Sequence, residues 1–394
     1  MTNWQEIEKK YHMQLFRRTP ITLVRGEGAR VWDDQGKEYL DFVAGIASVS
    51  LGHAHPILVE AVSHQIRTLA HVSNLYYTIP QLQLAQLLVE NSCMDRVFFC
   101  NSGAEANEGA VKLARKYGKV HLGGAYEVIT TLHSFHGRTL AMLAATGKPE
   151  GWVPFSPVPA GFTVVEFDDI EALKKATTGK TCAVLIEPIQ GEGGVNIPNP
   201  EYLPALRRWC DEKGILLIYD EIQTGVGRTG SLFGYEQVGA EPDIMTLAKG
   251  IAGGVPLGAF LAKERACAFD LGDHGSTFGG NPLATAAGYA VVKYIIDNDL
   301  SGHAIKMGEY LMARLNVLRS RFETIVDVRG RGLLVGLQFS SDMSAEIVRR
   351  CVENGLLLNP VRPNTIRFIP PLIITEAEVD TAVAILAKAL EAYA

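Results

Sequence analysis

Short apolar runs alternate with amphipathic stretches through the middle of the chain. The runs lie at residues 96–100, 127–132, 182–187, 215–220 and 243–247. Amphipathic stretches between them, such as residues 201–213, have the apolar spacing of helices. Near-continuous apolar strands separated by helices predict an α/β fold with a mostly parallel central sheet that is covered on both faces.

Both ends of the chain have a different pattern. Residues 30–39 predict a hairpin with the sequence DDQG at its turn, and the last hundred residues mix helices with short strands such as residues 331–339. We therefore expect a large domain at residues 61–290. A small α+β domain would be built from residues 1–60 and 291–394 together.

Composition narrows the classes of protein that remain. The chain has 394 residues, of which 47% are hydrophobic and 20% charged, and its net charge of −6 disfavours a nucleic-acid-binding protein. No charge-free apolar run approaches the roughly 20 residues that span a bilayer, and no signal peptide is visible. The six cysteines contain no C-x-x-C pair, so we expect reduced thiols and a cytoplasmic protein.

The first apolar run is followed by the start of a capped helix. Residues 101–105 (NSGAE) contain an S-x-x-E capping box, formed by Ser102 and Glu105. Gly103, inside the cap, lets a ligand approach free backbone N–H groups at the positive end of the helix, which suits a phosphate. An ordinary capped helix has the same sequence, so this feature alone does not identify a site.

Two carboxylates, Asp220 and Glu221, end the most apolar run. Burying them is costly unless a cationic group meets them. Residues 225–230 (GVGRTG) then match the G-x-G-x-x-G pattern of dinucleotide-binding loops, which keeps a nicotinamide-dependent dehydrogenase as an alternative. The glycine-rich segment that follows is no clean amphipathic helix, and the carboxylates would stand where a pyrophosphate binds. Both features disfavour a dinucleotide site.

A lysine, Lys249, follows the run at residues 243–247 and is surrounded by small residues. Lysines rarely lie in apolar, glycine-rich surroundings without a partner. Burial lowers the pKa of an amine and makes it a nucleophile suited to Schiff-base chemistry. The structural alternative is a lysine at the mouth of a loop whose stem covers apolar surface.

Two histidine pairs, His53 with His55 and His133 with His136, are candidates for metal ligands of a hydrolase. No acidic ligand lies beside either pair at a familiar spacing. We therefore interpret them as histidines of the core or of loops, and we expect no metal site.

Together, these features indicate one cofactor, pyridoxal 5′-phosphate. It needs a lysine for its aldehyde, a carboxylate that keeps its ring nitrogen protonated, a helix N-terminus for its phosphate and an aromatic face for its ring. Lys249, Asp220, residues 102–104 and Phe135 supply these four requirements from four separate strand ends. Each signal is modest by itself, and their joint occurrence in one α/β chain is much more specific.

The same residues carry a resemblance to a known family. The motifs are residues 101–107 (NSGAEAN), 133–138 (HSFHGR), 187–192 (EPIQGE), 220–223 (DEIQ), Lys249 and residues 275–282 (GSTFGGNP). In this order, and over essentially the whole chain, they resemble the class III pyridoxal-phosphate-dependent aminotransferases. The resemblance is greatest to the members that act on acetylornithine. It implies fold type I and a homodimer with shared active sites.

The resemblance also implies a role for each motif residue. Lys249 and Asp220 would be catalytic, as the lysine that bonds the cofactor and as the partner of the cofactor's ring nitrogen. Arg138 and Ser276 would contact the substrate. The other residues that would bind the cofactor are Ser102, Gly103, Ala104, Phe135, Gln223 and, from the other subunit, Thr277. Many relatives have threonine in place of Ala104, so one possible hydroxyl donor to the phosphate is missing here.

The activity that the resemblance implies is transfer of the δ-amino group of N2-acetyl-L-ornithine to 2-oxoglutarate. The products would be N-acetylglutamate 5-semialdehyde and L-glutamate, in a step of arginine biosynthesis. Alternatives with the same fold are enzymes that act on succinylornithine, ornithine or 4-aminobutyrate, and the aminomutase that makes 5-aminolevulinate. Ile46 disfavours free ornithine, because the ornithine enzymes resemble this stretch but carry tyrosine there. The alternative that is not an enzyme is a non-catalytic binding protein.

Two substrates of different charge must share the expected pocket. One arginine, Arg138, can hold the distant carboxylate of both acetylornithine and glutamate. The carboxylate next to the reacting carbon of glutamate needs a second cation, and by resemblance Arg367 fits this role. We expect Glu192 to neutralise Arg367 when acetylornithine is bound and to move away when glutamate binds, since an unpaired, partly buried charge is costly.

Overall fold

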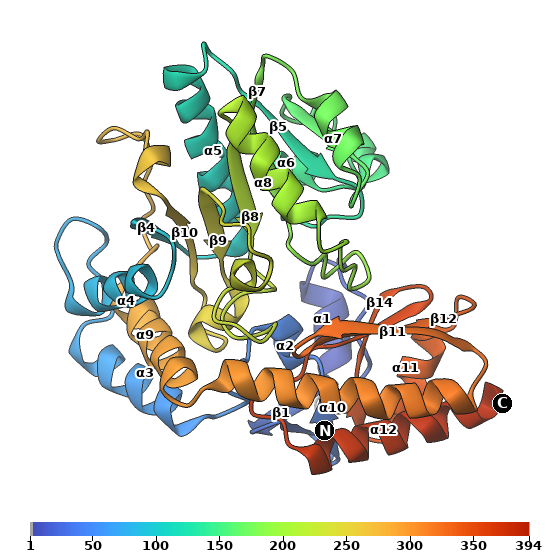
Figure 1. The fold of residues 1–394 in the computed structure, drawn as a ribbon. Helices are drawn as coiled ribbons and strands as arrows, with labels where there is room; N and C mark the ends of the chain where they lie inside the picture. Colours follow the sequence, from blue (N-terminus) through green and yellow to red (C-terminus); the bar gives the residue numbers. More distant parts are fainter. Residues whose placement is uncertain (1–2, 394) are drawn as a thin grey trace.

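The computed structural model describes residues 3–393, which form three β-sheets and the helices that cover them (Figure 1). The largest sheet has the strand order β4-β10-β9-β8-β7-β5-β6. Its strands are β4 (Arg96–Cys100), β5 (Glu127–Thr131), β6 (Phe162–Val165), β7 (Thr181–Ile186), β8 (Leu216–Asp220), β9 (Ile244–Leu247) and β10 (Gly258–Ala262). β10 runs antiparallel to β4 and β9, and the other neighbouring pairs are parallel. The expected α/β fold with a mostly parallel central sheet is confirmed.

Both faces of this sheet are buried, as the near-continuous apolar runs predict. Leu217 and Tyr219 of β8 belong to one apolar cluster, which includes residues of α8 (Tyr202–Lys213). Leu216 and Ile218 belong to a second cluster, which includes residues of α5 (Gly103–His121). Because neighbours along a strand point to opposite faces, each face needs its own layer of helices. Helices therefore cover both faces of the sheet, and a binding site can form only at the ends of the strands. The short helices α6 (Leu140–Ala145) and α7 (Ile170–Ala176) lie in the connections.

The two ends of the chain build the other two sheets. One has the order β1-β2-β3-β13, so that residues from both ends pair within it. The other has the order β11-β12-β15-β14 and packs against α10 (Leu300–Arg321). The remaining elements of these parts are β1 (Leu23–Glu27), β2 (Arg30–Asp33), β3 (Glu38–Asp41), β11 (Ile325–Arg331), β12 (Leu334–Phe339), α11 (Ser344–Glu353), β13 (Leu356–Leu357), β14 (Asn359–Arg362), β15 (Thr365–Phe368) and α12 (Glu376–Leu390). The predicted hairpin is confirmed as β2 and β3, and Gly36 in its turn has a φ of +82°.

Both expected domain boundaries fall inside helices. The boundary after residue 60 lies in α3 (Pro56–Thr68), and the one after residue 290 lies in α9 (Pro282–Asp297). These two helices pack against each other, and α4 (Ile79–Glu90) packs against α9 (Figure 1). We propose that the large and small domains divide at these two positions. The packed helices α3 and α9, and not a linker, then connect the two domains.

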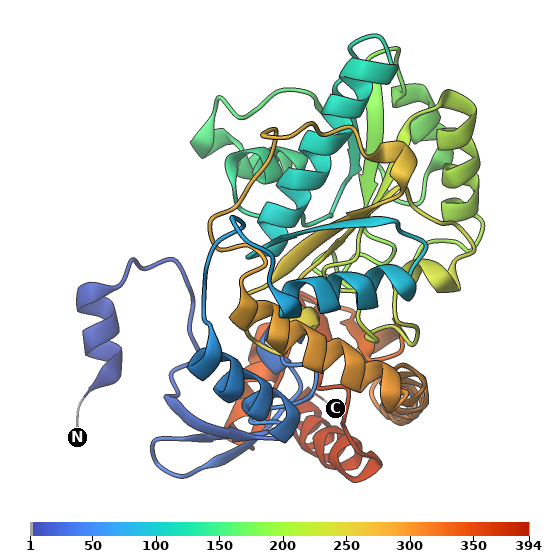
Figure 2. The ribbon, with the colours of Figure 1, turned by 90° about the vertical axis from the view of Figure 1, so that its left-hand side faces the viewer.

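The first helix, α1 (Trp4–Tyr11), buries none of its residues. Figure 2 shows it standing apart from the rest of the molecule. Among the helices of residues 3–393, none is long and apolar enough to cross a membrane.

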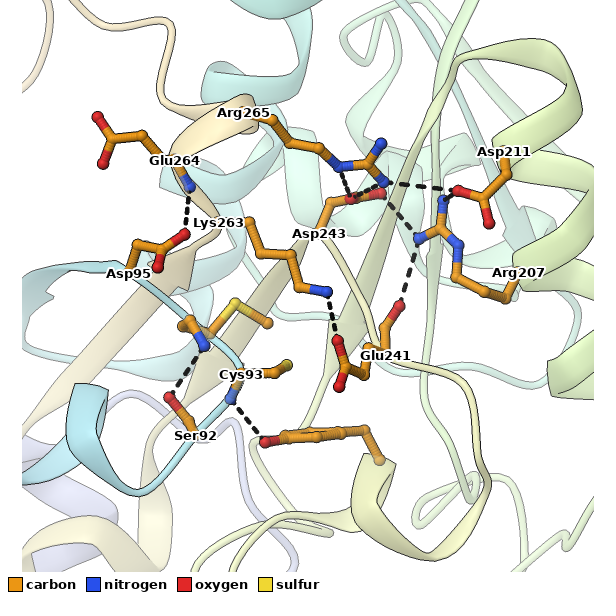
Figure 3. Close-up of polar contacts among 12 residues, drawn as sticks. Ser92, Cys93, Asp95, Arg207, Asp211, Glu241, Asp243, Lys263, Glu264 and Arg265 are labelled. Carbon is orange, nitrogen blue, oxygen red and sulfur yellow. Dashed lines mark hydrogen bonds and ion pairs between the residues drawn. The ribbon is translucent and has the colours of Figure 1, made fainter.

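A buried carboxylate, Asp243, joins several elements at the amino-terminal end of β9 (Figure 3). It accepts hydrogen bonds from Arg207 of α8 at 2.9 Å, from Arg265 Nε at 2.7 Å and from the backbone N–H of Leu217 in β8 at 2.8 Å. Two guanidinium groups and a backbone donor therefore satisfy the charge of Asp243. The cluster holds β8, β9 and α8 together at the end of the sheet opposite Lys249, which follows β9.

We expect the Asp243→Ala change to lower the free energy of unfolding by roughly 3 kcal/mol, because the largely buried Arg207 guanidinium and the Leu217 N–H lose their acceptor. The matched control is Asp211→Ala. It removes a more exposed acid, 2.6 Å from the same Arg207, and should cost less than about 1 kcal/mol. Urea denaturation measures both values. Equal losses in the two variants would contradict the assigned role of Asp243.

Candidate active site

A cavity of about 350 Å³ opens at the carboxyl ends of β8 and β9. Ligands of open parallel sheets bind at this edge. Nine of the residues expected from the sequence line the cavity: Ser102, Gly103, Ala104, Phe135, Arg138, Glu192, Asp220, Gln223 and Lys249. The fold therefore brings together side chains from widely separated parts of the chain. Ser276, Thr277 and Arg367 are not among the residues that line it.

Asp220, the last residue of β8, is buried and held by three donors. Its Oδ2 accepts a hydrogen bond from Asn107 Nδ2 at 2.8 Å and lies 2.7 Å from Nδ1 of His136. Its Oδ1 accepts from the backbone N–H of Ile222 at 3.1 Å. A carboxylate can only accept, so Nδ1 of His136 carries the proton in this contact. Three donors to one acid fix its orientation.

Asn107 and His136 contact Asp220, and the sequence alone assigns neither of them a role beside it. Asn107 is fully buried on α5, where it also donates to the backbone carbonyl of His136 at 2.8 Å and accepts from Thr246 Oγ1 at 2.8 Å. His136 is buried, as expected for a core histidine, but it also contacts Asp220. The sequence feature that points to Asn107 is its polar side chain beside Ala106 and Ala110 on an otherwise apolar helix face.

Lys249 follows β9 in a strained backbone conformation. Its φ is +48°, in the left-handed region, which costs a non-glycine residue roughly 1–2 kcal/mol. Burial lowers the pKa of its amine. Strain and a lowered amine pKa at a cavity wall are both typical of a nucleophile.

The start of α5 carries a cap that differs by one residue from the expected box. Ser102 Oγ accepts from the N–H of Glu105 at 3.2 Å, as expected. The carboxylate of Glu105, however, accepts from the backbone N–H of Asn101 at 2.7 Å and not from that of Ser102. The negative charge of Glu105 is thus folded back onto Asn101. The N–H groups of Gly103 and Ala104, in the first turn, have no intrahelical acceptor and lie at the cavity.

Gly103 is needed for close packing at this point. A Cβ atom added there would lie 2.7 Å from Cδ1 of Ile222. Ile222 belongs to the segment after β8, two residues from Asp220, so the glycine lets the start of α5 approach the end of β8.

Phe135 is held in the cavity wall through a buried glutamate. Its backbone N–H donates to Glu187 Oε1 at 3.0 Å, and the N–H of Gly191 donates to Glu187 Oε2 at 3.0 Å. Burial, and then the nearby Asp220, raise the pKa of Glu187. Glu187 therefore links the aromatic residue to the loop that carries Glu192. Arg138 is exposed, with its guanidinium carbon 5.2 Å from the centre of the Phe135 ring.

Glu192 and Arg367 form an ion pair beside the cavity. Their Oε1 and Nη1 atoms are 2.6 Å apart, and the Arg367 side chain is fully buried. Arg367 also donates to Gln223 Oε1 at 2.8 Å and to Asn359 Oδ1 at 2.6 Å. Burial works against ionisation of Glu192, but Arg367 and then Lys249 hold its pKa below the usual value. Arg367 is thus a buried cation whose carboxylate partner reaches the cavity.

These residues fit pyridoxal phosphate by the chemistry that they offer. Lys249 presents an amine for the aldehyde, and the buried Asp220 presents a carboxylate for a protonated ring nitrogen. The N–H groups of Gly103 and Ala104 are donors for a phosphate at the helix start, and Phe135 offers an aromatic face. Gln223 also lines the cavity.

The segment at residues 275–282 contributes nothing to the cavity within one chain. Ser276 Oγ accepts from the N–H of Gly279 at 2.9 Å and from Asn101 Nδ2 at 3.3 Å. Thr277 is exposed. Their roles toward substrate and cofactor stay predictions, and the role of Thr277 was expected across a subunit boundary.

The dinucleotide alternative does not fit the structure. Arg228 and Thr229, in the middle of the loop at residues 225–230, are buried with 2% and 1% of their surface exposed. The loop leads into a short 3₁₀ turn, Gly234–Gln237, and not into an α-helix whose N-terminus would face a pyrophosphate.

A strained turn, α2 (Ala44–Ala47), precedes Ser48, which lines the cavity. Ile46 in this turn has a φ of +61°, which is costly for a β-branched residue. The side chain of Ile46 is not among the lining residues, so its effect on free ornithine stays a prediction.

Comparisons with known proteins agree with this geometry. A family model described as Aminotransferase class-III matches residues 13–390. The acetylornithine aminotransferase of Caldanaerobacter subterraneus subsp. tengcongensis is 53% identical, over 96% of this chain and 97% of its own. That of Methanocaldococcus jannaschii is 50% identical, over 97% and 96%.

Solved structures are similar over almost the whole chain. The acetylornithine aminotransferase of Elizabethkingia anophelis has a TM-score of 0.88 and 34% identity, covering 99% of this chain and 98% of that one. The ornithine aminotransferase of Toxoplasma gondii ME49 has a TM-score of 0.95 and 35% identity, covering 99% and 94%. The fold is therefore shared by proteins named for two different amines.

We expect the Lys249→Ala protein to fold but to lose its covalent hold on the cofactor and nearly all turnover, because no other lysine lines the cavity within residues 3–393. Borohydride reduction followed by mass spectrometry should attach a pyridoxyl group to Lys249 of the wild type and to no residue of the variant. Normal steady-state transamination by the variant would overturn the assignment.

Proposed function

Because this chain belongs to the class III aminotransferases, whose cofactor is pyridoxal phosphate, we propose that it transfers the δ-amino group of N2-acetyl-L-ornithine to 2-oxoglutarate. The products are N-acetylglutamate 5-semialdehyde and L-glutamate, in a step of arginine biosynthesis. The observation that carries this proposal is the Glu192–Arg367 pair beside a cavity that Arg138 also lines. The names of the relatives at 50% and 53% identity support the choice of amine.

The charges of the two substrates explain why such a pair is useful. In acetylornithine the reacting δ-carbon bears no carboxylate, and the only carboxylate lies four bonds away. In glutamate the reacting carbon bears one carboxylate, and the second lies three bonds away. Arg138 can hold the distant carboxylate of both, because the reach is nearly equal. Arg367 is then needed for glutamate alone.

Glu192 adapts the site to this difference. When acetylornithine is bound, Arg367 would be a fully buried cation without a substrate partner, and Glu192 at 2.6 Å neutralises it. When glutamate or 2-oxoglutarate binds, its near carboxylate takes the place of Glu192 on Arg367. Gln223, which contacts both Arg367 and Glu192, stays beside them in either state.

The residues around the cavity divide the work of the reaction. When bound, the cofactor supplies an electron sink for the bond that is broken at the amine-bearing carbon. Lys249 Nζ, whose pKa burial lowers, would bond the cofactor at rest and, once the substrate amine has displaced it, would take and return the proton at that carbon. Asp220, held by His136 and Asn107, would keep the proton on the ring nitrogen. The N–H groups of Gly103 and Ala104 would bind the phosphate.

A panel of amines assayed with 2-oxoglutarate tests the proposed function. The panel contains acetylornithine, succinylornithine, ornithine and 4-aminobutyrate. We expect the highest kcat/KM with acetylornithine. A preference for free ornithine or 4-aminobutyrate would overturn the choice of substrate, and no turnover of any amine would overturn the activity.

The chain works as a cytoplasmic homodimer in this proposal. Several large apolar side chains are exposed, and one of them, Phe278, lies in the segment at residues 275–282. The exposed fraction is 70% for Tyr76, 93% for Tyr77 and 60% for Phe278. The protruding helix α1 exposes Trp4 as well, at 53%. A second copy would cover such surface and would bring its own Thr277 to this cavity. The six cysteines are free, which suits the cytoplasm.

We expect the Glu192→Ala change to weaken the half-reaction with acetylornithine and to spare or improve the one with glutamate. Their ratio should shift by roughly tenfold or more, since an unpaired buried charge costs on the order of a few kcal/mol. Single-turnover rates measure each half-reaction separately. The control Asn359→Ala removes a neutral acceptor of Arg367 and should affect both equally. Equal losses in Glu192→Ala would leave only a structural ion pair.

We expect cofactor retention to fall when the protein is diluted to monomer, and Thr277→Ala to weaken retention in the dimer, because Thr277 donates to the phosphate across the boundary. Sedimentation gives the oligomeric state, and equilibrium dialysis at the same concentrations gives the bound cofactor. Unchanged affinity in a demonstrably monomeric sample would count against the shared site.

A further inference from the structure

The loop at residues 225–230 joins the central sheet to the C-terminal sheet. Arg228, at its centre, is buried and donates from Nη1 to the carbonyl oxygens of Leu333 at 3.0 Å and Pro370 at 2.6 Å. In return, the backbone N–H of Leu333 donates to the carbonyl of Arg228 at 3.0 Å. Leu333 precedes β12, and Pro370 follows β15. Arg228 therefore bonds to the ends of two neighbouring strands of the other sheet.

Close backbone packing fixes this contact. A Cβ atom at Gly332, whose φ is +52°, would lie 2.6 Å from the carbonyl carbon of Thr229 and 2.7 Å from the carbonyl oxygen of Arg228. Only glycine fits between the loop and the β11–β12 turn. The G-x-G-x-x-G segment thus serves contact between sheets and not contact with a nucleotide.

Gln223, just before this loop, contacts Arg367. Gln223, five residues before Arg228, accepts from Arg367 Nη1 at 2.8 Å. Pro370, which accepts from Arg228, lies three residues after Arg367. Gln223 therefore contacts the head group of Arg367, and Arg228 contacts the chain just after the strand that carries it.

Charge is unevenly distributed around these two arginines. Within residues 3–393, Arg228 forms no ion pair with a carboxylate, and its head group meets carbonyl oxygens. Burial, and then the charge of Arg367, lower the pKa of Arg228. Glu192 is the acid that pairs with Arg367. Of these two buried guanidinium groups, only that of Arg367 contacts a carboxylate within residues 3–393.

We propose that Arg228 is a positioning residue for the dicarboxylate substrate and acts through Arg367. It holds the strand end that carries Arg367, and its unpaired charge favours a second carboxylate beside Glu192. This inference rests on the proposed function, since it requires a dicarboxylate at Arg367.

The charge balance explains the selectivity. With Glu192 on Arg367, the group formed by Arg228, Arg367 and Glu192 has one surplus positive charge. Entry of the near carboxylate of glutamate or 2-oxoglutarate neutralises this surplus in a buried region, where charge interactions are stronger than in water. Acetylornithine brings no carboxylate to Arg367, so it gains nothing from Arg228.

Binding of glutarate, a dicarboxylate that cannot react, to the holoenzyme provides the test. Isothermal calorimetry should show a Kd that rises roughly tenfold in Arg228→Met, a loss of about 1.4 kcal/mol. The KM for 2-oxoglutarate should rise similarly, whereas the acetylornithine half-reaction should stay within about twofold.

The Arg228→Lys variant distinguishes the effect of the positive charge at this position from the effect of the guanidinium's hydrogen bonds. A buried lysine has a lowered pKa, so its charge is present at low pH and is lost as pH rises. Glutarate should bind Arg228→Lys almost as tightly as the wild type near pH 6, and as weakly as Arg228→Met near pH 9. A merely structural role would not produce this relative pH dependence.

Arg329→Met is the matched control. Arg329 also donates to two backbone carbonyls, those of Gly194 at 2.6 Å and Val195 at 2.9 Å, but its charge is paired with Asp327 at 2.7 Å. Its glutarate Kd should stay within about threefold, because the surplus charge is intact.

Three outcomes would overturn the inference. They are an unchanged glutarate Kd in Arg228→Met, equal losses in both half-reactions, and failure of both Arg228 variants to fold and retain cofactor, which would make Arg228 structural. Failure of the wild type to use acetylornithine would instead overturn the proposed amine. The glutarate comparison would still decide the role of Arg228.

Discussion

A carboxylate held in the core, Asp220, is the constraint on which the rest of the site depends. It ends a strand whose residues are all buried, where an unpaired charge is very costly. His136 and Asn107 orient this carboxylate through hydrogen bonds at 2.7 and 2.8 Å. The acid therefore favours a positively charged group in the cavity beside it, which is what a protonated pyridine nitrogen provides. The hydrogen-bond donors hold Asp220 in position, and its negative charge would be balanced by the cofactor's protonated ring nitrogen.

The same reasoning applies at the other wall of the site. Arg367 and Glu192 form a buried ion pair, which we propose a substrate carboxylate opens, and within residues 3–393 Arg228 pairs with no carboxylate. Asp220 and Lys249 stand at the carboxyl ends of strands of the central sheet, whereas Arg367 comes from β15 of the C-terminal sheet. The cluster around Asp243 lies away from the site, at the amino-terminal end of β9.

The sequence predicts those residues that stand at the end of a recognisable strand. Asp220 and Lys249 are of this kind, and both line the cavity. Asn107 and His136 are 113 and 84 residues away from Asp220 along the chain, and only tertiary packing brings them to it. The direction of β10 also depends on pairing and not on local pattern. The shift of the Glu105 contact from Ser102 to Asn101 is a matter of side-chain rotamer, which spacing does not specify.

The most direct test of the central claim is the protonation state of the cofactor's ring nitrogen in the assembled site. Nitrogen-15 NMR of the holoenzyme, carrying cofactor labelled at that atom, reports it without turnover. We expect a protonated nitrogen at neutral pH in the wild type and its loss in Asp220→Asn, which keeps the shape of the side chain but removes the charge. An unprotonated nitrogen in the wild type, or a protonated one in Asp220→Asn, would contradict the role assigned to the buried carboxylate.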